Sequence, residues 1–253
     1  MRADVYLVSG GFVKSRSAAQ NLISKSGVSI NGKLVTKPSE NIDENAENTV
    51  EITQKEKYVG RGGYKLEYAL EHFGISVEGM TAIDVGASTG GFTDCLLQKG
   101  AVKVFAVDSG ENQLDSSLAD DVRVVNIEKY NARNLKKEDF PANIDIAVMD
   151  VSFISQTLII PALSQLLDDG AIFVSLIKPQ FEVGRSAVGK KGIVKNPKDR
   201  QNAVRNVISF AESFGLGCFG LDESVITGGD GNIEYVAAFK KGTLNKISID
   251  LKR

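Results

Sequence analysis

The chain has 253 residues, of which 42% are hydrophobic and 25% are charged, and its formal net charge is −2. This length and composition fit a soluble globular protein with either one large domain or two smaller ones. No apolar run approaches the roughly 20 residues that span a bilayer, and the N-terminus lacks the apolar centre of a signal peptide. We therefore expect a cytoplasmic protein. A single histidine and two cysteines leave no cluster for a metal site, so none is expected.

The basic side chains gather in two stretches of the sequence. Residues 1–37 carry six Lys and Arg against one acid, and residues 178–205 carry eight against two. The remainder of the chain is correspondingly acidic. This arrangement favours a protein that binds a polyanion at two defined places, although either stretch alone could also be an ordinary solvated face.

Residues 1–55 have the apolar spacing of a small α+β domain. Two helices and three strands are predicted, the helices at 2–12 and 15–26 and the strands at 28–30, 34–36 and 49–52. The Asn31-Gly32 pair between the first two strands predicts a hairpin turn. A short polar linker is predicted at 56–60.

Three segments of this domain carry a specific pattern: R-x-D-V-x-L-V at 2–8, S-R-S-x-A-x-x-L-I at 15–23 and V-x-I-N-G-K-x-V-T-K-P at 28–38. Together they resemble the RNA-binding module named after ribosomal protein S-four, which presents basic residues from its second helix and hairpin to folded RNA. The resemblance implies phosphate contacts, which position a protein without reading sequence. The side chains that match by position are Arg2, Lys14, Arg16, Lys25, Lys33 and Lys37, with plain solvation favoured for Lys14 and Lys25 individually.

Residues 61–242 alternate strands and helices, as a doubly wound α/β domain does. A helix from 61 to 73 precedes the first strand, and later helices are predicted at 155–167 and 197–214. Seven strands are predicted, at 82–85, 102–107, 122–125, 144–149, 171–177, 217–226 and 234–239. Such a series with a closing hairpin fits the Rossmann-like sheet of S-adenosylmethionine-dependent methyltransferases. The basic loop 182–196 is long for this fold, and residues 243–253 are predicted to be a C-terminal tail.

The first strand of this domain runs into a small-residue turn and then an amphipathic helix, a unit that binds nucleosides in such folds. Its pattern is D-x-G-x-S-x-G, whereas a dinucleotide site would read G-x-G-x-x-G, so S-adenosylmethionine is favoured over NAD. Asp108 ends the second strand, where such folds place a carboxylate against ribose hydroxyls. The predicted cofactor-binding residues are Asp84, Gly86, Ser88, Gly90 and Asp108, with Asn131 toward the adenine.

Four charged residues that are distant in the sequence are predicted to meet at one edge of the sheet. Asp150 and Lys178 directly follow the fourth and fifth strands, and the carboxyl ends of parallel strands share one edge. Lys65 lies on the helix that enters the first strand, and Glu234 begins the last strand. Two cations and two carboxylates would then surround one pocket, with two ordinary ion pairs as the alternative.

The contexts of these four residues are G-x-x-K-L, M-D-V-S-F, L-I-K-P and N-I-E-Y. Such a Lys-Asp-Lys-Glu set resembles that of the heat-shock (FtsJ-like) 2′-O-ribose methyltransferases. With the N-terminal module, D-V-G-A-S-T-G-G-F and K-P-Q-F-E-V-G, residues 2–240 resemble the TlyA family. The resemblance implies a cytidine-2′-O-methyltransferase of ribosomal RNA that uses S-adenosylmethionine. Further RNA contacts are expected from Arg61, Arg185, Lys190 and Lys191.

The chemistry of ribose methylation gives each of the four residues a role. A ribose 2′-hydroxyl must lose its proton as it attacks a sulfonium methyl group, and a neutral lysine can take that proton when burial and a second cation favour the neutral form. Lys178 is the candidate base, with Asp150 orienting it. Lys65 and Glu234 would hold the ribose in line, and such positioning needs no metal.

Two other classes of function stay open. A membrane-active haemolysin would need an amphipathic or spanning apolar element, and the sequence offers none. A ribosome-assembly factor with a non-catalytic methyltransferase domain would leave no 2′-O-methyl mark on RNA. For the enzyme and the assembly factor alike, the expected partner is ribosomal RNA or a ribosomal subunit. The sequence does not determine the oligomeric state.

Overall fold

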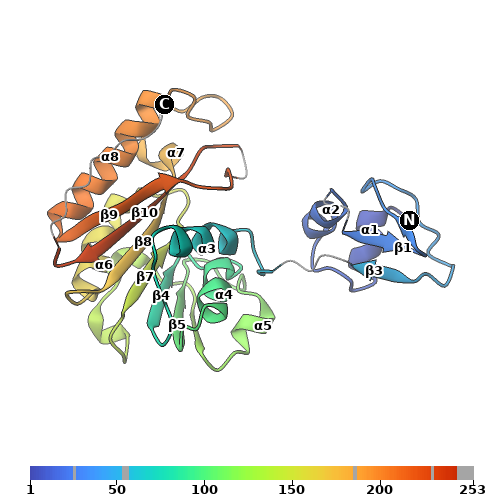
Figure 1. Ribbon diagram of the computed structural model, residues 1–253, viewed down its shortest axis with the longest axis horizontal. Coiled ribbons are helices and arrows are strands. Elements are labelled where there is room, and N and C mark those ends of the chain that lie inside the picture. Colours follow the sequence, from blue (N-terminus) through green and yellow to red (C-terminus); the bar gives the residue numbers. More distant parts are fainter. Residues whose placement is uncertain (25–26, 53–56, 185–186, 229–230, 244–253) are drawn as a thin grey trace. The chain divides into compact units, whose positions relative to one another are not determined.

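The computed structural model describes residues 1–24, 27–52, 57–184, 187–228 and 231–243. The chain divides into two compact units, Met1–Lys57 and Tyr58–Arg253 (Figure 1). Tyr58 is 3% exposed and belongs to the hydrophobic core of the second unit. Residues 58–60, predicted as linker, therefore belong to the second unit, and residue 56 of the predicted linker lies outside the described residues.

The first unit combines helices with a small antiparallel sheet. Its described elements are α1 (Ala3–Ser9), α2 (Arg16–Ser24), β1 (Val28–Ile30), β2 (Lys33–Leu34) and β3 (Val50–Ile52). Among the described residues the strand order is β2-β1-β3, and the core joins Leu7, Ile23 and Val28. The hairpin prediction is confirmed, because Asn31 and Gly32 both have positive φ angles, 54° and 73°, as a type I′ turn requires.

The second unit is built on a mixed sheet that has seven strands within the described residues, in the order β6-β5-β4-β7-β8-β10-β9. The strands are β4 (Thr81–Val85), β5 (Lys103–Val107), β6 (Val124–Ile127), β7 (Ile146–Met149), β8 (Ile172–Ile177), β9 (Leu216–Glu223) and β10 (Tyr235–Lys241). Strands β4 to β8 are parallel, and β10 runs antiparallel between β8 and β9. The predicted Rossmann-like methyltransferase sheet is confirmed.

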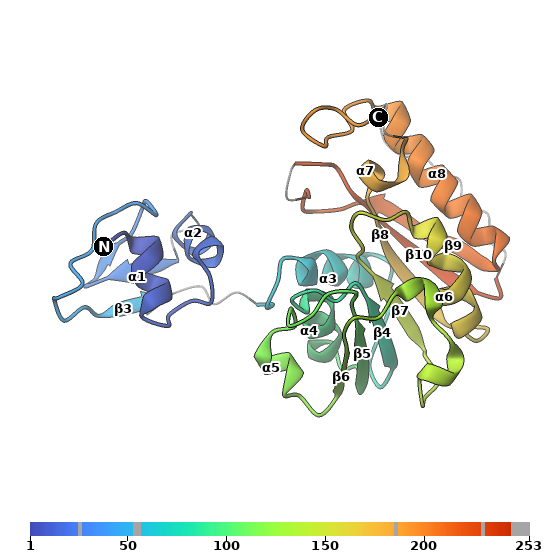
Figure 2. The same ribbon diagram turned by 180° about the vertical axis from the view of Figure 1, so that it is seen from behind.

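Helices cover both faces of this sheet (Figure 2). The long ones are α3 (Gly62–His72), α4 (Gly91–Gln98), α6 (Ile160–Leu166) and α8 (Pro197–Ser213). Successive side chains of a strand point to opposite faces. Ala82 of β4 therefore joins the core with Leu66 of α3, whereas Ile83 joins the core with Leu163 of α6. Burial on both sides explains why the strands are nearly continuous apolar runs.

The short helices of the second unit were not all predicted. They are α5 (Ser116–Ala119), η1 (Ala132–Asn134), η2 (Lys137–Asp139), η3 (Gln156–Leu158) and α7 (Pro179–Glu182). The predicted helix at 155–167 is divided into η3 and α6, and Pro161 lies in the first turn of α6, where its missing N–H is tolerated. The third strand lies two residues later than predicted, and Val122 is 96% exposed.

Candidate active site

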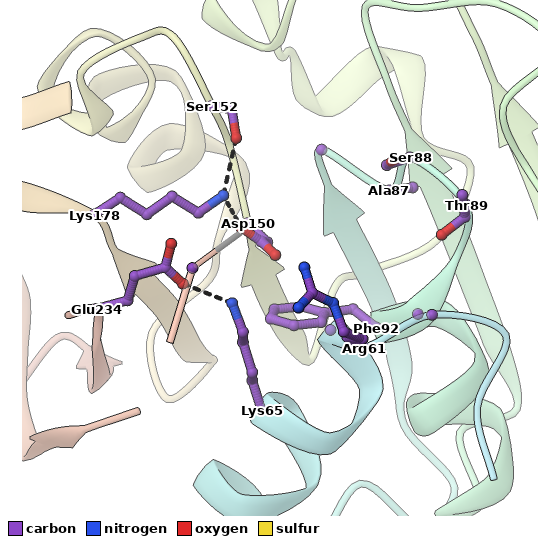
Figure 3. Close-up of a pocket in the computed structure, with 15 residues that line it drawn as sticks. Arg61, Lys65, Ala87, Ser88, Thr89, Phe92, Asp150, Ser152, Lys178 and Glu234 are labelled. Carbon is purple, nitrogen blue, oxygen red and sulfur yellow. Dashed lines mark hydrogen bonds and ion pairs between the residues drawn. The ribbon is translucent and has the colours of Figure 1, made fainter. Parts of the chain in front are cut away.

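A cavity of about 310 Å³ opens at the carboxyl edge of the sheet (Figure 3). Gly86, which follows β4, Asp150, which follows β7, and Lys178, which follows β8, all line it. Lys65 of α3 and Glu234, which precedes β10, line it as well. The structure thus brings together all four members of the predicted Lys-Asp-Lys-Glu set, which we call the tetrad.

The tetrad forms two ion pairs. Lys65 Nζ lies 2.6 Å from Glu234 Oε2, and Lys178 Nζ lies 2.5 Å from Asp150 Oδ1. Lys65, Lys178 and Glu234 are only 8%, 9% and 3% exposed. Buried charges are tolerated when they are paired, and here each ammonium has a carboxylate at contact distance.

The sheet register explains why residues so distant in sequence are neighbours. Tyr235 pairs with Ile177 across β10 and β8, so Glu234 and Lys178 lie at adjacent ends of these two strands. The Asp150 N–H donates to the carbonyl of Val85 at 3.0 Å, which extends the β4–β7 ladder by one residue. The tetrad is therefore a consequence of strand pairing.

The glycine turn after β4 forms the opposite wall of the cavity (Figure 3). Gly86 has a φ of 85°, and a Cβ there would lie 2.6 Å from the backbone oxygen of Asp150. Gly90 has a φ of 94°, and a Cβ there would lie 2.3 Å from a methyl group of Leu118. Only glycine fits these positions. The turn presents Ala87, Ser88 and Thr89 to the cavity, whereas Gly90 is outside the lining.

Two of the predicted cofactor residues support local structure. The Asp108 carboxylate accepts hydrogen bonds from the Ser88 N–H at 2.8 Å and the Gly110 N–H at 2.7 Å, and so fixes the glycine turn. Asn131 caps η1 by accepting from the Arg133 N–H at 3.1 Å. Neither residue lines the cavity, so their contacts with a nucleoside stay predictions.

Asp84, the third predicted acid of this site, is completely buried and also does not line the cavity. The Thr93 hydroxyl donates to its Oδ2 at 2.7 Å, and its Oδ1 has no hydrogen-bond partner among the described residues. Burial is the main cause that raises the pKa of Asp84 to about 7, against the opposing hydrogen bonds from Thr93. A carboxyl group with such a pKa is partly protonated at neutral pH.

Sequence reasoning missed several residues of the cavity. Ser152 lines it and accepts a hydrogen bond from Lys178 Nζ at 2.9 Å. Phe92 lines it from the start of α4. Gly228 also lines it, and a Cβ at that position would lie 2.5 Å from Glu234 Oε1. A serine two positions after an acid carries no signal of its own, whereas Gly228 stands in a glycine-rich loop.

Phe153 follows Ser152 and stands out by its exposure. Its side chain is 92% exposed, its φ is 63°, and its ring centroid lies 5.1 Å from that of Phe181 in α7. The loop is anchored beyond this point, because Ser155 Oγ donates to Glu182 at 2.6 Å. Burial raises the pKa of Glu182. An exposed ring in a strained backbone conformation beside a cavity is a functional candidate.

In the first unit, two predicted RNA-binding residues converge on one acid. Arg2 Nε lies 2.9 Å and Arg16 Nη2 lies 3.1 Å from the carboxylate of Asp4, which also accepts from Gln20 at 2.9 Å. Asp4 is fully buried, whereas the two arginine side chains are 49% and 58% exposed. Hydrogen bonds from Arg2 and Gln20 hold the pKa of Asp4 well below its usual range. The two guanidinium groups are thus held side by side at the surface.

The other predicted RNA-binding residues are more scattered. Lys33 Nζ lies 3.3 Å from Glu40, and Arg61 lines the cavity of the second unit. Lys14, Lys37, Lys190 and Lys191 are exposed. Arg185 and Lys25 lie outside the described residues.

Across the described parts of the chain, no group of three or more His, Cys, Asp or Glu side chains could hold a metal ion. Nor is any described helix both long enough and apolar enough to span a bilayer. Cys95 and Cys218 are both buried and are not joined in a disulfide.

Comparison with known proteins gives two family matches and several relatives. Residues 58–241 match the FtsJ-like methyltransferase family, and residues 1–48 match the S4 domain. Hemolysin A of Brachyspira hyodysenteriae is 46% identical over 240 residues, which are 94% of this chain and 99% of that protein. The 16S/23S rRNA (cytidine-2′-O)-methyltransferase TlyA of Mycobacterium tuberculosis is 42% identical over 234 residues, 92% of this chain and 87% of that protein.

Solved structures agree with the fold. A Streptococcus thermophilus protein described as a hemolysin is 43% identical, with a TM-score of 0.77 over 98% of this chain and 91% of its own. The fibrillarin of Aeropyrum pernix with bound S-adenosylmethionine is 14% identical, with a TM-score of 0.51 over 78% of this chain and 90% of its own. At that identity the likeness shows the fold alone.

Proposed function

We propose that this chain, which belongs to the FtsJ-like methyltransferase family, methylates the 2′-hydroxyl of cytidine ribose in ribosomal RNA, with S-adenosylmethionine as donor. The observation that carries the proposal is the tetrad, whose two ion pairs face the glycine turn across one cavity. The relative named TlyA acts on cytidine 2′-oxygens of ribosomal RNA, and it is 42% identical over 92% of this chain. The match of residues 1–48 to an RNA-binding domain supports RNA as the substrate.

The residues of the cavity fit a nucleoside cofactor. The turn from Gly86 to Thr89 has no room for a side chain at Gly86, so the backbone itself can approach a ligand. Asp108 holds this backbone in place through Ser88. When bound, S-adenosylmethionine supplies an electrophilic methyl group on a sulfonium centre. We assign Gly86 and Ser88 to its methionine part and Asp108 to the neighbourhood of its ribose.

Lys178 is the base of the proposed reaction. Its amine takes the proton of the ribose 2′-hydroxyl while the new O–C bond forms and the C–S bond of the donor breaks. Asp150, 2.5 Å away, stabilises the ammonium that results. A buried base of this kind contributes roughly 10²–10⁴-fold to the rate.

Lys65 and Glu234 position the substrate. They form the second buried pair at 2.6 Å, on the side of α3 and β10. An ammonium can donate to a ribose oxygen, and a carboxylate can accept from a ribose hydroxyl. Holding the ribose in line with the methyl group lowers the entropic part of the barrier without any metal.

RNA is held at two kinds of surface in this proposal. Arg2 and Arg16 contact phosphates from the first unit, where Asp4 keeps their guanidinium groups together. Arg61 and the exposed lysines 190 and 191 contact RNA on the second unit. Phe153 offers an exposed ring on which an unstacked base can lie.

Mapping of 2′-O-methylcytidine in ribosomal RNA tests the proposal. RNA from cells that lack the protein is compared with RNA from cells complemented with the wild type or with Lys178→Ala. We expect at least one methylated cytidine that disappears without the protein and returns only with the wild type. Identical methylation in all three RNA samples contradicts the proposal and favours a non-catalytic assembly factor.

A further inference from the structure

The Lys178 amine has two polar neighbours of different kinds. Asp150 Oδ1 lies 2.5 Å from Nζ as an ion pair, yet this oxygen has no aligned hydrogen bond among the described residues. The hydrogen bond that Nζ donates goes to Ser152 Oγ, at 2.9 Å. Coulomb attraction depends mainly on distance, whereas a hydrogen bond weakens steeply as its angle departs from linearity. Ser152 is therefore the neighbour that fixes the rotation of the amine about its Cε–Nζ bond.

This rotation decides what an amine can do as a base. A neutral primary amine has two N–H bonds and one lone pair at three staggered positions, and rotation exchanges them. With one N–H on Ser152 and the second beside Asp150, the lone pair takes the third position. Lys178, Asp150 and Ser152 all line the cavity (Figure 3), so a hydroxyl group in the cavity can be met by the lone pair.

We infer that Ser152 is a positioning residue that aims the Lys178 lone pair at the ribose 2′-hydroxyl. The inference rests on the proposed function, in which Lys178 accepts the hydroxyl proton. The proton passes from the 2′-oxygen to Nζ while the O–C bond forms and the C–S bond of the donor breaks. The ammonium that results keeps its contacts with Asp150 and Ser152, so the side chain does not have to move during the step.

The loop places Ser152 independently of its bond to Lys178. On one side, Asp150 is fixed to Val85 by a backbone hydrogen bond of 3.0 Å. On the other side, Ser155 Oγ donates to Glu182 at 2.6 Å and the Gln156 N–H donates to the same carboxylate at 2.9 Å. Because both sides are anchored, the serine oxygen is held in place before substrate binds, which is the condition for a preorganised site.

Kinetics of serine variants test the inference. Wild type, Ser152→Ala, Ser152→Thr and Ser155→Ala are compared with labelled S-adenosylmethionine and ribosomal subunits from cells that lack the protein. The variant Ser155→Ala is the matched control, because it removes a hydroxyl that supports the same loop from the far side of Ser152. Each variant is also measured for S-adenosylmethionine binding by calorimetry and for thermal unfolding.

We expect Ser152→Ala to lower kcat about tenfold, as the loss of one hydrogen bond to a charged group predicts. The KM values and the affinity for S-adenosylmethionine stay within twofold. The conservative Ser152→Thr, which keeps the hydroxyl, retains most of the wild-type kcat. In Ser155→Ala the melting temperature falls, whereas kcat stays within about twofold, because the Gln156 N–H still holds the loop to Glu182. The kcat of Ser152→Ala is lower than that of the wild type at every pH between about 6 and 10.

Other outcomes overturn the inference. An unchanged kcat in Ser152→Ala, or an equal loss in Ser155→Ala, assigns the hydroxyl no role beyond loop support. If the pH–rate profile of Ser152→Ala is shifted to another pH but keeps the wild-type maximum, the hydroxyl affects the protonation of Lys178 and not the direction of its lone pair. If the wild type itself transfers no methyl group, the proposed function fails and the inference fails with it. An active wild type with a fully active Ser152→Ala refutes the inference alone.

Discussion

The Lys65–Glu234 ion pair is buried deeply enough for its loss to be measured in stability as well as in activity. The variant Lys65→Met keeps an unbranched side chain one atom shorter but leaves the Glu234 carboxylate, which is 3% exposed, without the ammonium that lies 2.6 Å from it. Breaking a buried pair from one side costs about 3–5 kcal/mol. For a unit of about 200 residues this lowers the melting temperature by roughly 10 °C.

The double variant Lys65→Met/Glu234→Gln distinguishes a structural pair from a catalytic one. Both charges are then absent, so the unpaired buried carboxylate and its cost are removed, and we expect most of the lost melting temperature to return. Methyl transfer stays low, because the ammonium donor to the ribose is not restored and the charged carboxylate acceptor is replaced by a weaker amide oxygen. The control is Lys99→Met, whose side chain is 30% exposed and pairs with Glu67 at 3.0 Å and with Glu71 at 2.6 Å. A pair at that surface contributes at most about 1 kcal/mol.

Circular dichroism melting and transfer of labelled methyl groups to ribosomal subunits are the two assays. If the double variant recovers both stability and methyl transfer, the pair is an ordinary ion pair and its catalytic role is refuted. If Lys65→Met melts at the same temperature as Lys99→Met, the reasoning from burial is wrong.

Four further predictions each have their own measurement. The variant Lys178→Ala keeps its fold and S-adenosylmethionine binding but loses at least about 100-fold in methyl transfer, and activity within a few fold of wild type would exclude it as the base. The variant Gly86→Ala forces a Cβ to within 2.6 Å of the Asp150 backbone, so calorimetry should detect little S-adenosylmethionine binding, whereas normal affinity contradicts the close approach. Burial raises the pKa of Asp84 from 3.8 to about 7, so the folded state keeps a proton that the unfolded chain loses, and the free energy of unfolding falls as pH rises from about 4 to 7. The variant Asp84→Asn should remove this dependence of the melting temperature on pH. If the dependence is unchanged in Asp84→Asn, it comes from other groups. The variant Asp4→Asn weakens the contact that holds the Arg2 and Arg16 guanidinium groups together. Filter binding should then show about fivefold lower affinity for ribosomal RNA, with an unchanged circular dichroism spectrum. Equal affinity would show that Asp4 does not position these two groups for RNA binding.

The tetrad could be predicted from the sequence because its charged residues stand next to predicted strands and helices whose ends meet at one edge of the sheet. Asp150 and Lys178 each stand directly after an apolar run, and parallel strands bring such ends to one edge. Glu234 could be placed because it begins the last predicted strand and its N-I-E-Y context resembles the methyltransferase family, whereas the pairing of Tyr235 with Ile177 is known only from the structure. Periodicity and topology were sufficient for Asp150 and Lys178.

The parts of the site that depend on the turn of a loop could not be predicted. The exposed Phe153 ring stands on a backbone with a left-handed φ of 63°, a conformation that a phenylalanine gives no reason to expect. Asp108 accepts from two backbone N–H groups, a supporting contact that was not predicted, and its contact with a ribose stays a prediction. The sequence does not show which backbone N–H groups a carboxylate will accept hydrogen bonds from. A carboxylate that supports a turn therefore has the same sequence pattern as one that binds a ligand.

The charged residues of the proposed function fall into two groups, those of the tetrad and the exposed basic residues outside it. While both lysines are protonated, each ammonium is matched by a carboxylate, so the tetrad is neutral until Lys178 loses its proton and becomes the base. A neutral tetrad does not repel a sulfonium donor, whereas one unmatched lysine about 5 Å away would do so by about 3 kcal/mol at an effective dielectric constant of 20. The same neutrality means that the tetrad adds little attraction for a polyanion. Under the proposed function, affinity for RNA then comes from exposed cations outside the tetrad, and Arg2, Arg16 and the lysines at 190 and 191 are the proposed contacts.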